Sequence, residues 1–348
     1  MKRIIVFSLV LTSLLMGDEI YRYGTTAANF LEIGMGSAPS AMGEAYVAMS
    51  SGDLASVYWN PAGIGYMQKN ELVFMYQPWV VDINTIFAST GIVVPGVGTL
   101  ALSMTQVGYG NMDVTTMEFQ DGTGESFTAN ELAAGVTFAR RLATWFSFGA
   151  TGKLINSQIR HVKASAFAMD LGVIVNTNFL SRSGENADGV SIGMSISNYG
   201  SRMRYDGIDL LQPIDINVYQ DGNYADVPGQ FRMQAWELPL IFRIGVAMHP
   251  IVSTNQRLTV ALDALHPNNN NESINAGVQY ELRIPGAGRF FLRTGYKALG
   301  MDSSEFGLTG GGGFELFLMG NRSIQIDYAF KEIGLLGRTH AYTIGLTL

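Results

Sequence analysis

The chain has 348 residues, a formal net charge of −7 and no cysteine. Apolar residues make up 47% of it and charged residues only 15%, against about 25% charged in average soluble domains. This composition disfavours an ordinary soluble enzyme, because so little charge indicates burial against something other than water. The length fits either two domains or one large all-β barrel.

The first 17 residues have the pattern of a secretory signal peptide. Lys2 and Arg3 form a basic start, Ile4 to Met16 form an apolar core, and Gly17 is a small residue where cleavage is expected. An apolar run of about 13 residues is shorter than the roughly 20 that a spanning helix needs, which favours export over a retained anchor. Loss of the two basic residues changes the net charge from −7 to about −9, so no nucleic-acid partner is expected. Export without cysteine is typical of a bacterial envelope protein held by backbone hydrogen bonds.

The stretch VYWNPAGIGYM, residues 57–67, comes just before a long series of alternating residues. Pro61 and the glycines at 63 and 65 argue against a helix, and a proline cannot donate to a strand ladder. The residue types alone therefore predict a rigid aromatic-proline turn that leads into the first strand.

From residue 71 onward, apolar and polar residues alternate with a period of two. In ELPLIFRIGVAMHP, residues 237–250, every even position from 238 to 248 is apolar. Side chains of a strand point alternately to opposite faces, so such segments have one apolar side. Most are near the roughly 9–11 residues that a tilted strand needs to cross hydrocarbon. We expect 14 strands, at 71–81, 83–94, 98–114, 127–141, 146–160, 165–177, 190–200, 237–249, 256–266, 272–282, 290–298, 303–316, 323–332 and 339–348.

The connections between these segments alternate in length, as in a barrel with short periplasmic turns and longer outer loops. The long connections are 115–126 and 201–236. The 178–189 connection is longer than an inner turn should be and counts against the scheme. The short inner turns are expected at 95–97, 142–145, 250–255, 284–289 and 317–322.

Both a soluble sandwich and a membrane barrel would alternate in this way. After the signal no stretch approaches 18 consecutive apolar residues, which excludes helical membrane spans. The polar faces are rich in small residues and poor in the charges that protect soluble edges, which favours the membrane barrel. Aromatic residues near segment ends fit an interfacial girdle, namely Trp79, Tyr109, Trp145, Tyr199 and Tyr296.

The sequence carries no defensible catalytic or metal-binding constellation. The four histidines, at 161, 249, 266 and 340, lie in different segments without metal-ligand spacing. We therefore expect no enzyme, no cofactor and no metal site. Charges expected inside the barrel have mixed signs, which fits either a network that grips a plug or independent solvated charges. They are Glu131, Lys153, Asp170, Arg243, Asp263, Glu281, Arg283, Arg293, Lys297, Asp327 and Lys331.

Residues 36–67, GSAPSAMGEAYVAMSSGDLASVYWNPAGIGYM, resemble the N-terminal signature of the PorV/PorQ family, which is related to the FadL fatty-acid transporters. Residues 40–43 and 45–48 match its first part, and 59–63 match its second. Later motifs in the same order extend the resemblance over the mature chain. There are two departures: Glu44 stands at a glycine-rich position of the family, and the chain ends in Leu348 where many barrels have an aromatic residue.

The resemblance implies an all-β fold, a 14-stranded antiparallel transmembrane β-barrel in the bacterial outer membrane with an N-terminal hatch inside the lumen. The implied division is a signal peptide at 1–17, a hatch at 18–70 and a barrel at 71–348. The hatch motif would consist of Trp59, Asn60, Pro61, Ala62 and Gly63.

Two functions remain open for such a barrel in outer-membrane lipid. One is a partner role in type IX-like protein secretion and surface attachment, with secretion components or exported cargo as partners. The loop 201–236 would then present an apolar anchor, with Trp236 as the candidate residue. The alternative is FadL-like transport of hydrophobic small molecules past a movable hatch.

Overall fold

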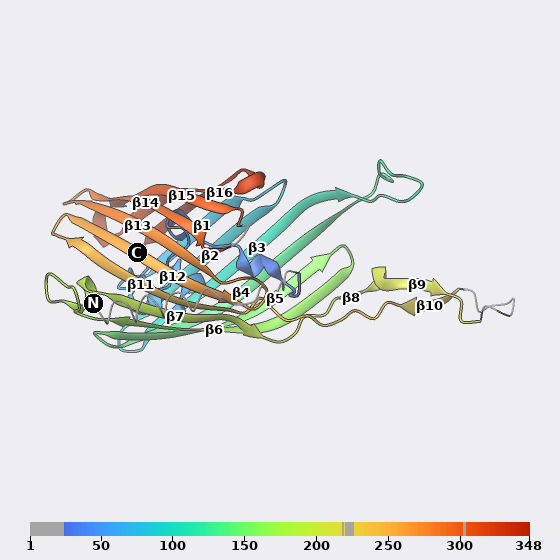
Figure 1. Cartoon of the computed structure of the whole chain (residues 1–348), viewed down its shortest axis with the longest axis horizontal. Helices are drawn as coiled ribbons and strands as arrows, with labels where there is room; N and C mark the ends of the chain where they lie inside the picture. Colours follow the sequence, from blue (N-terminus) through green and yellow to red (C-terminus); the bar gives the residue numbers. More distant parts are fainter. Residues whose placement is uncertain (1–23, 218, 220–225, 302–303) are drawn as a thin grey trace, which may run out of the picture.

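The computed structural model describes residues 24–217, 219, 226–301 and 304–348. Seven strands precede the long loop and seven follow it, and together these 14 form the barrel wall (Figure 1). They are β1 Glu71–Pro78, β2 Asn84–Val94, β3 Gly98–Asp113, β4 Ser126–Ala143, β5 Phe146–Ile159, β6 Val162–Asn176, β7 Ser191–Gly200, β11 Ile241–Val252, β12 Gln256–Pro267, β13 Ser273–Ile284, β14 Gly288–Leu299, β15 Phe306–Phe317, β16 Ser323–Ile333 and β17 Arg338–Thr347.

The wall is a closed antiparallel ring. Each wall strand pairs with the wall strands next to it in the sequence, β7 pairs with β11 across the long loop, and β17 pairs with β1. The closing pairs run from Glu71 opposite Thr347 to Tyr76 opposite Tyr342. In hydrocarbon every backbone N–H and C=O needs an internal partner, so a ring without a free edge meets this requirement. The 14 predicted strands are confirmed, with ends that differ by a few residues.

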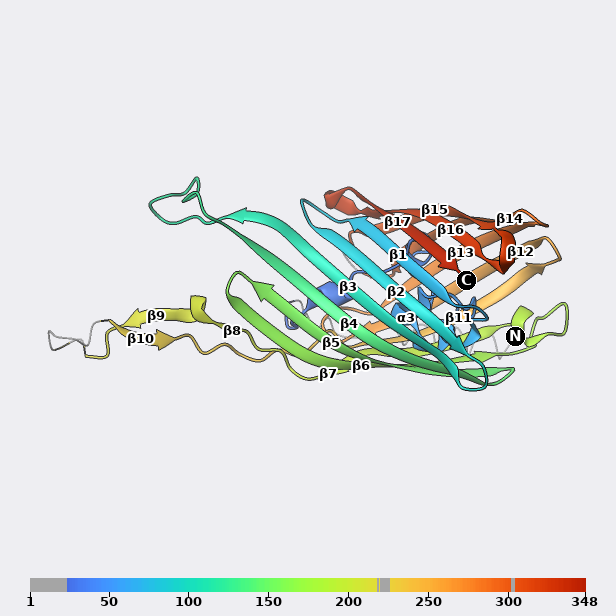
Figure 2. The same cartoon turned by 180° about the vertical axis from the view of Figure 1, so that it is seen from behind.

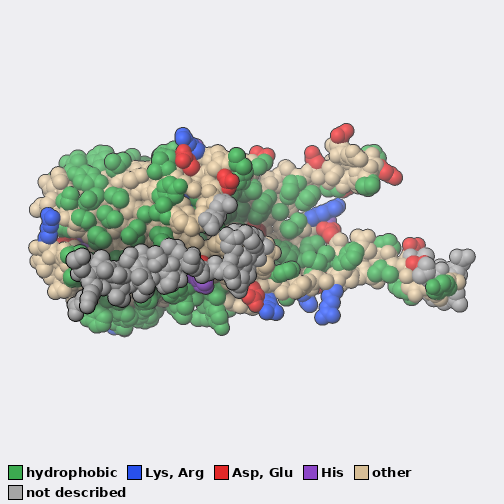
Figure 3. Space-filling model, in the orientation of Figure 1, with side chains coloured by type: hydrophobic (Ala, Val, Ile, Leu, Met, Phe, Trp, Pro, Cys, Tyr) green, Lys and Arg blue, Asp and Glu red, His purple; other side chains and the backbone are tan. Residues whose placement is uncertain are grey.

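The period-two pattern places apolar side chains on the outside. In β1, Leu72, Phe74 and Tyr76 are exposed, whereas Val73 and Met75 are buried. Figure 3 shows apolar side chains spread over the outer surface of the barrel. This outer face is the one that contacts lipid. No helix among the described residues is long and apolar enough to cross a membrane.

The two ends of the barrel differ. At the turn end, wall strands are joined by short connections such as residues 95–97 and 285–287. The 177–190 connection also lies at this end, between β6 and β7, so its length does not break the alternation of ends. It contains η3 (Asn186–Asp188), whose Asp188 pairs with Arg257 at 3.2 Å. The expected alternation of the strands is therefore intact.

At the loop end two projections extend beyond the barrel (Figures 1 and 2). One is the long hairpin of β3 and β4, and the other is the loop between β7 and β11. This loop contains β8 (Asp206–Gly207), which pairs with β6, and then η4 (Ile208–Leu210). Its outer part is a separate two-stranded sheet of β9 (Leu211–Ile214) and β10 (Val227–Gln230), which we call the arm. Two 3-10 helices, η5 (Met319–Asn321) and η6 (Gly334–Leu336), lie in connections of the C-terminal half.

Residues 24–70, the inner segment, lie against the inner face of the wall (Figure 2). The segment begins at the loop end, where Thr26 bridges Glu237, and ends at the turn end, where the Asn70 carbonyl accepts from Leu348 N. Its elements are η1 Asn29–Glu32, α2 Ser37–Ala41, α3 Ser56–Trp59 and η2 Pro61–Tyr66. The largest fully buried side chains of the protein include several from this segment, namely Met35, Met42, Leu54, Trp59 and Ile64.

The stretch 57–67 contains two short helices, so the argument that proline and glycine exclude a helix there is wrong. α3 ends at Trp59, Asn60 adopts an extended conformation, and Pro61 begins the 3-10 helix η2. Proline is tolerated at the first helical position because its missing N–H would have no helical partner there. The Asn60 side-chain oxygen accepts from Ala62 N at 3.1 Å and caps η2.

Candidate functional site

The candidate functional site is the interface between the inner segment and the barrel wall. Its best-defined part is the predicted motif at residues 59–63. Trp59 is 1% exposed, and its indole Nε1 donates to the Met35 carbonyl at 2.8 Å. Ser195 Oγ of β7 donates to the Trp59 carbonyl at 3.0 Å. The Arg243 guanidinium of β11 lies 5.5 Å from the Trp59 ring centre, a cation–π distance.

Asn60 joins two parts of the inner segment to the wall. Its Nδ2 donates to the Val47 carbonyl at 2.8 Å and to the Val173 carbonyl of β6 at 3.1 Å. Beside it, the Ala62 carbonyl accepts from Ser147 Oγ of β5 at 2.8 Å. The motif therefore contacts three consecutive wall strands, β5, β6 and β7, through polar contacts of buried groups.

Inward glycines of the wall let the inner segment approach closely. A Cβ at Gly149 would overlap the backbone of Pro61, and a Cβ at Gly193 would overlap the Val47 carbonyl. Glycine is often found in strands where another backbone comes close. The wall glycines that meet the backbone of the inner segment in this way are Gly149 on β5, Gly193 on β7, Gly277 on β13 and Gly295 on β14. Four others meet its side chains, namely Gly91 on β2, Gly172 on β6, Gly245 on β11 and Gly311 on β15.

Glu44 is the charged centre of the interface. It is 3% exposed, and its carboxylate pairs with Lys297 Nζ of β14 and Lys331 Nζ of β16, each at 2.8 Å. Burial alone would raise the pKa of Glu44, but the two ammonium groups outweigh it and lower the pKa to about 2. Glu44 has φ +67° and follows Gly43, which has φ +66°. This left-handed pair turns the carboxylate toward both lysines.

A second contact beside Glu44 has the opposite polarity. The Asp263 carboxylate of β12 accepts from the backbone amides of Tyr46 at 2.7 Å and of Val47 at 2.9 Å. The segment thus offers a carboxylate to wall cations at residue 44 and two amide donors to a wall carboxylate at residues 46–47. Together these contacts fix the orientation of residues 44–47.

Most other inward charges pair within the wall. Lys153 pairs with Asp170 at 2.8 Å, and Arg293 pairs with Asp327. Both members of each pair belong to wall strands. The expected network of charges between the wall and the inner segment therefore includes only some of the inward charges. The others pair with one another inside the wall.

The loop-end half of the lumen contains an apolar cluster. Phe30 and Leu31 of η1 are buried among small and branched wall residues such as Ile155, Ala166 and Val107. Tyr109, expected in the interfacial girdle, belongs to this interior instead, because its hydroxyl bonds to Glu131. The girdle interpretation is wrong for Trp79 as well, because the inward Lys331 lies 4.8 Å from its ring centre.

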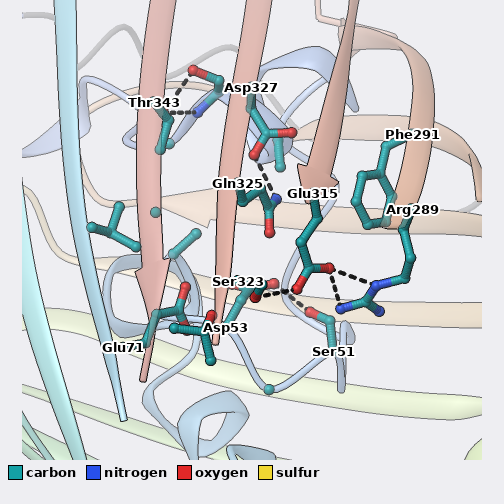
Figure 4. Close-up of a pocket in the computed structure, with 18 of the residues that line it drawn as sticks. Ser51, Asp53, Glu71, Arg289, Phe291, Glu315, Ser323, Gln325, Asp327 and Thr343 are labelled. Carbon is teal, nitrogen blue, oxygen red and sulfur yellow. Dashed lines mark hydrogen bonds and ion pairs between the residues drawn. The ribbon is translucent and has the colours of Figure 1, made fainter. Parts of the chain in front are cut away.

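The turn-end half of the lumen contains a polar cavity of about 370 Å³ (Figure 4). Residues 36–38 and 51–55 of the inner segment form one side of it. Inward side chains of β1 and β13–β17 form the other. The turn-end cavity is thus polar, whereas Phe30 and Leu31 of the chain itself occupy the apolar part of the loop end.

Trp236, the candidate loop anchor, lies at the base of the long loop. Its backbone pairs with Met203 in both directions, at 2.8 and 2.9 Å, and its side chain is 40% exposed. Farther out, the arm exposes Leu211 and Ile214.

Among the described residues no three acidic, histidine or cysteine side chains form a group that could hold a metal ion.

Comparison with known proteins identifies the family. A family model described as type IX secretion system protein PorV matches residues 17–226, more than half of the chain. The chain belongs to the PorV family. Membership and the closed 14-stranded barrel place the protein in the bacterial outer membrane. No curated protein matches the sequence.

Solved structures similar to this PorV-family chain are barrels of the FadL type. The toluene transporter TodX of Pseudomonas putida aligns with TM-score 0.54 and 12% identity, over 90% of this chain and 96% of that one. A FadL homologue of Pseudomonas aeruginosa aligns with TM-score 0.52 and 10% identity, over 90% and 98%. The toluene transporter TbuX of Ralstonia pickettii aligns with TM-score 0.52 and 11% identity, over 90% and 97%. At these identities the likeness concerns the fold alone.

Glu44 is a central residue of the candidate site that the sequence does not identify. The sequence marks it only as a departure from a glycine-rich position of the family. The available signal was a lone carboxylate within a small-residue stretch, combined with inward lysines at 297 and 331. A buried carboxylate requires a cation, and those lysines could have been considered as its partners.

Proposed function

We propose that this protein is an outer-membrane partner in type IX protein secretion, which receives exported polypeptides or binds other secretion components at the cell surface. The observation that carries the proposal is the PorV-family match over residues 17–226. The interior supports it, because Phe30 and Leu31 pack into an apolar cluster with the wall in the loop-end half of the lumen and so occupy space that a transported apolar molecule would need. We propose no enzymatic role.

The long loop is the proposed partner-binding element. The arm projects away from the barrel, and a two-stranded sheet by itself is at best marginally stable in water. Its exposed Leu211 and Ile214 would gain stabilisation by burial against a partner. Trp236 would anchor the base of the same surface, since half-exposed tryptophans are frequent hot spots.

We further propose that residues 18–70 act as a hatch that seals the barrel 71–348, with residues 59–63 as its fixed point. Their bonds to β5, β6 and β7 support this role. In this proposal the barrel serves as a sealed platform for its loops. Residues 1–17, the proposed signal peptide, lie outside the described residues.

The test compares a deletion strain with strains that carry defined variants. Loss of the gene should leave type IX cargo in the periplasm, and replacement of residues 208–232 by a short Gly-Ser linker should do the same while the barrel stays in the membrane. Trp236→Ala should weaken recovery of secretion components in pull-downs, with Trp145→Ala as control, because Trp145 lies at the turn end and is also exposed. Normal surface display of cargo in the deletion strain would refute the proposal.

The second candidate function, hydrophobic transport, is favoured by one observation, the similarity of the fold to FadL-type barrels. It predicts that the deletion strain takes up an apolar compound such as toluene more slowly. It also predicts that Phe30→Ala, which would open space in the filled half of the lumen, changes that uptake. Unchanged uptake together with retained cargo would leave secretion as the function.

A further inference from the structure

The polar cavity at the turn end has two walls of different electrostatic character. On β13–β16 each charge has a partner: Arg289 pairs with Glu315 at 2.6 Å and with Glu281 at 3.3 Å, and Arg293 pairs with Asp327. Because these two arginines face three carboxylates, this wall keeps an excess of negative charge.

Elsewhere the cavity is lined by two carboxylates without a cation, one from the inner segment and one from β1. Figure 4 shows Asp53 of the inner segment and Glu71 of β1 beside one another. Asp53 Oδ2 accepts from the hydroxyls of Tyr46 and Ser51, but Asp53 Oδ1 is shielded from solvent and has no hydrogen-bond partner. Among the described residues neither carboxylate forms an ion pair, and the nearby Lys69 is bonded to Asn321 instead.

Gln279 presents an unused donor to the same cavity. It is 7% exposed and lines the cavity, and its Oε1 accepts from Arg293 Nε at 2.7 Å. Its Nε2 has no hydrogen-bond partner among the described residues. Because Gln279 lines the cavity, its Nε2 is available to donate to an oxygen of a ligand bound there.

We propose that this cavity binds an organic cation, whose ammonium or guanidinium group lies between Asp53 and Glu71. Two adjacent carboxylates without a counter-ion repel each other, which favours a proton on one of them, and a cation that displaces this proton would stabilise both ionised groups. Two carboxylates fall short of the six to eight oxygens that calcium takes, which favours an ammonium or guanidinium group over a metal ion. The cation can belong to a free amine or to a lysine or arginine side chain of a polypeptide that reaches the turn end.

Gln279 distinguishes these two sources. A polypeptide carries backbone carbonyl oxygens that can accept from Gln279 Nε2, whereas a free amine such as agmatine has no carbonyl. The inference does not depend on the proposed secretion role, because it concerns binding to the purified protein.

The experiment measures binding to the full mature protein in detergent by isothermal titration calorimetry. The probes are agmatine and the capped peptide Gly-Gly-Lys-Gly-Gly, with the same peptide containing norleucine in place of lysine as control. We expect saturable binding of a cationic probe, at least tenfold weaker in Glu71→Gln and in Asp53→Asn. Glu272→Gln, an exposed carboxylate of a loop-end connection, should bind as the wild type does. Gln279→Ala should weaken the lysine peptide alone if the ligand is a polypeptide.

Three results would overturn the proposal: no saturable binding of either cation, equal binding of the norleucine peptide, or full binding in both carboxylate variants. A compact, unboiled band in SDS gels verifies that each variant is folded. The comparison of the lysine and norleucine peptides needs only the wild-type protein, so it decides the matter even if a carboxylate variant fails to fold.

Discussion

Glu44 Oε1 and Lys331 Nζ lie 2.8 Å apart, although 287 residues separate them in the chain. Both side chains are almost fully buried, at 4% and 2% exposed. The pair joins the beginning of the folded chain to one of its last strands. Removal of one member would leave the other as an uncompensated buried charge, so the pair is a strong constraint on the inner segment.

Glu44→Gln should destabilise the protein by about 3–5 kcal/mol, because Lys297 and Lys331 lose their common counter-ion inside the barrel. The measurement is thermal unfolding in detergent, followed by the temperature at which the compact gel band is lost. Glu332→Gln is the matched control. Glu332 pairs with Arg338 at the surface, where a pair contributes about 0–1 kcal/mol. Equal losses in the two variants would contradict the central role of Glu44.

The inner segment should loosen in acid. The pKa of Glu44 is lowered from 4.5 to about 2, so the folded state binds its proton more weakly than the unfolded state does. The resulting stabilisation is fully present above pH 4.5 and is lost as the pH falls through 4.5 toward 2. Protease cleavage within residues 24–70 should increase over this range. In Glu44→Gln this acid-dependent increase should be absent, and its persistence would assign the transition to another group.

Gly149→Val should prevent the inner segment from seating, because its side chain would overlap Pro61. The expected result is a barrel with a lower unfolding temperature and a protease-sensitive inner segment. Gly152→Val, three residues along the same strand, is the control, since a Cβ there meets only the Phe167 ring at 3.8 Å. If Gly149→Val and Gly152→Val are equally sensitive to protease, the effect comes from replacing a strand glycine in general and not from the contact of residue 149 with Pro61.

Asn60→Ala should cost about 1–3 kcal/mol, because it removes the cap of η2 and leaves the buried carbonyls of Val47 and Val173 without their donor. Chemical denaturation of the purified protein gives the number. Asn178→Ala, at an exposed site of the turn-end connection, should lie within about 0.5 kcal/mol of the wild type. If Asn60→Ala also changes the stability by no more than about 0.5 kcal/mol, water replaces the hydrogen bonds of the Asn60 amide.

The barrel could be predicted from the sequence because alternation carries the information strand by strand. Each segment such as β11 has six apolar side chains on one face, and the local pattern suffices to place it on a wall. The helical content of residues 56–66 could not be predicted, because Pro61 and the glycines have low helix propensity. There the contacts with β5–β7 and the Asn60 cap decide the conformation, and they become visible only in three dimensions.

The same limit applies to the candidate site. The motif at residues 59–63 could be found because its residue types are unusual together. Which wall residue meets Glu44 depends on the ring closing at the correct register, and no local pattern encodes a partner some 250 to 290 residues away. Single charges of this kind are assigned by geometry rather than by periodicity.

The seam between β1 and β17 has a consequence for biogenesis. It joins the first wall strand to the last one synthesised, so the cylinder cannot shut until translation has finished and the C-terminal strand has arrived. The inner segment is made before any wall strand and ends up surrounded by all of them. It can therefore reach its place while the sheet is still open, before the pairing of β1 with β17 encloses it.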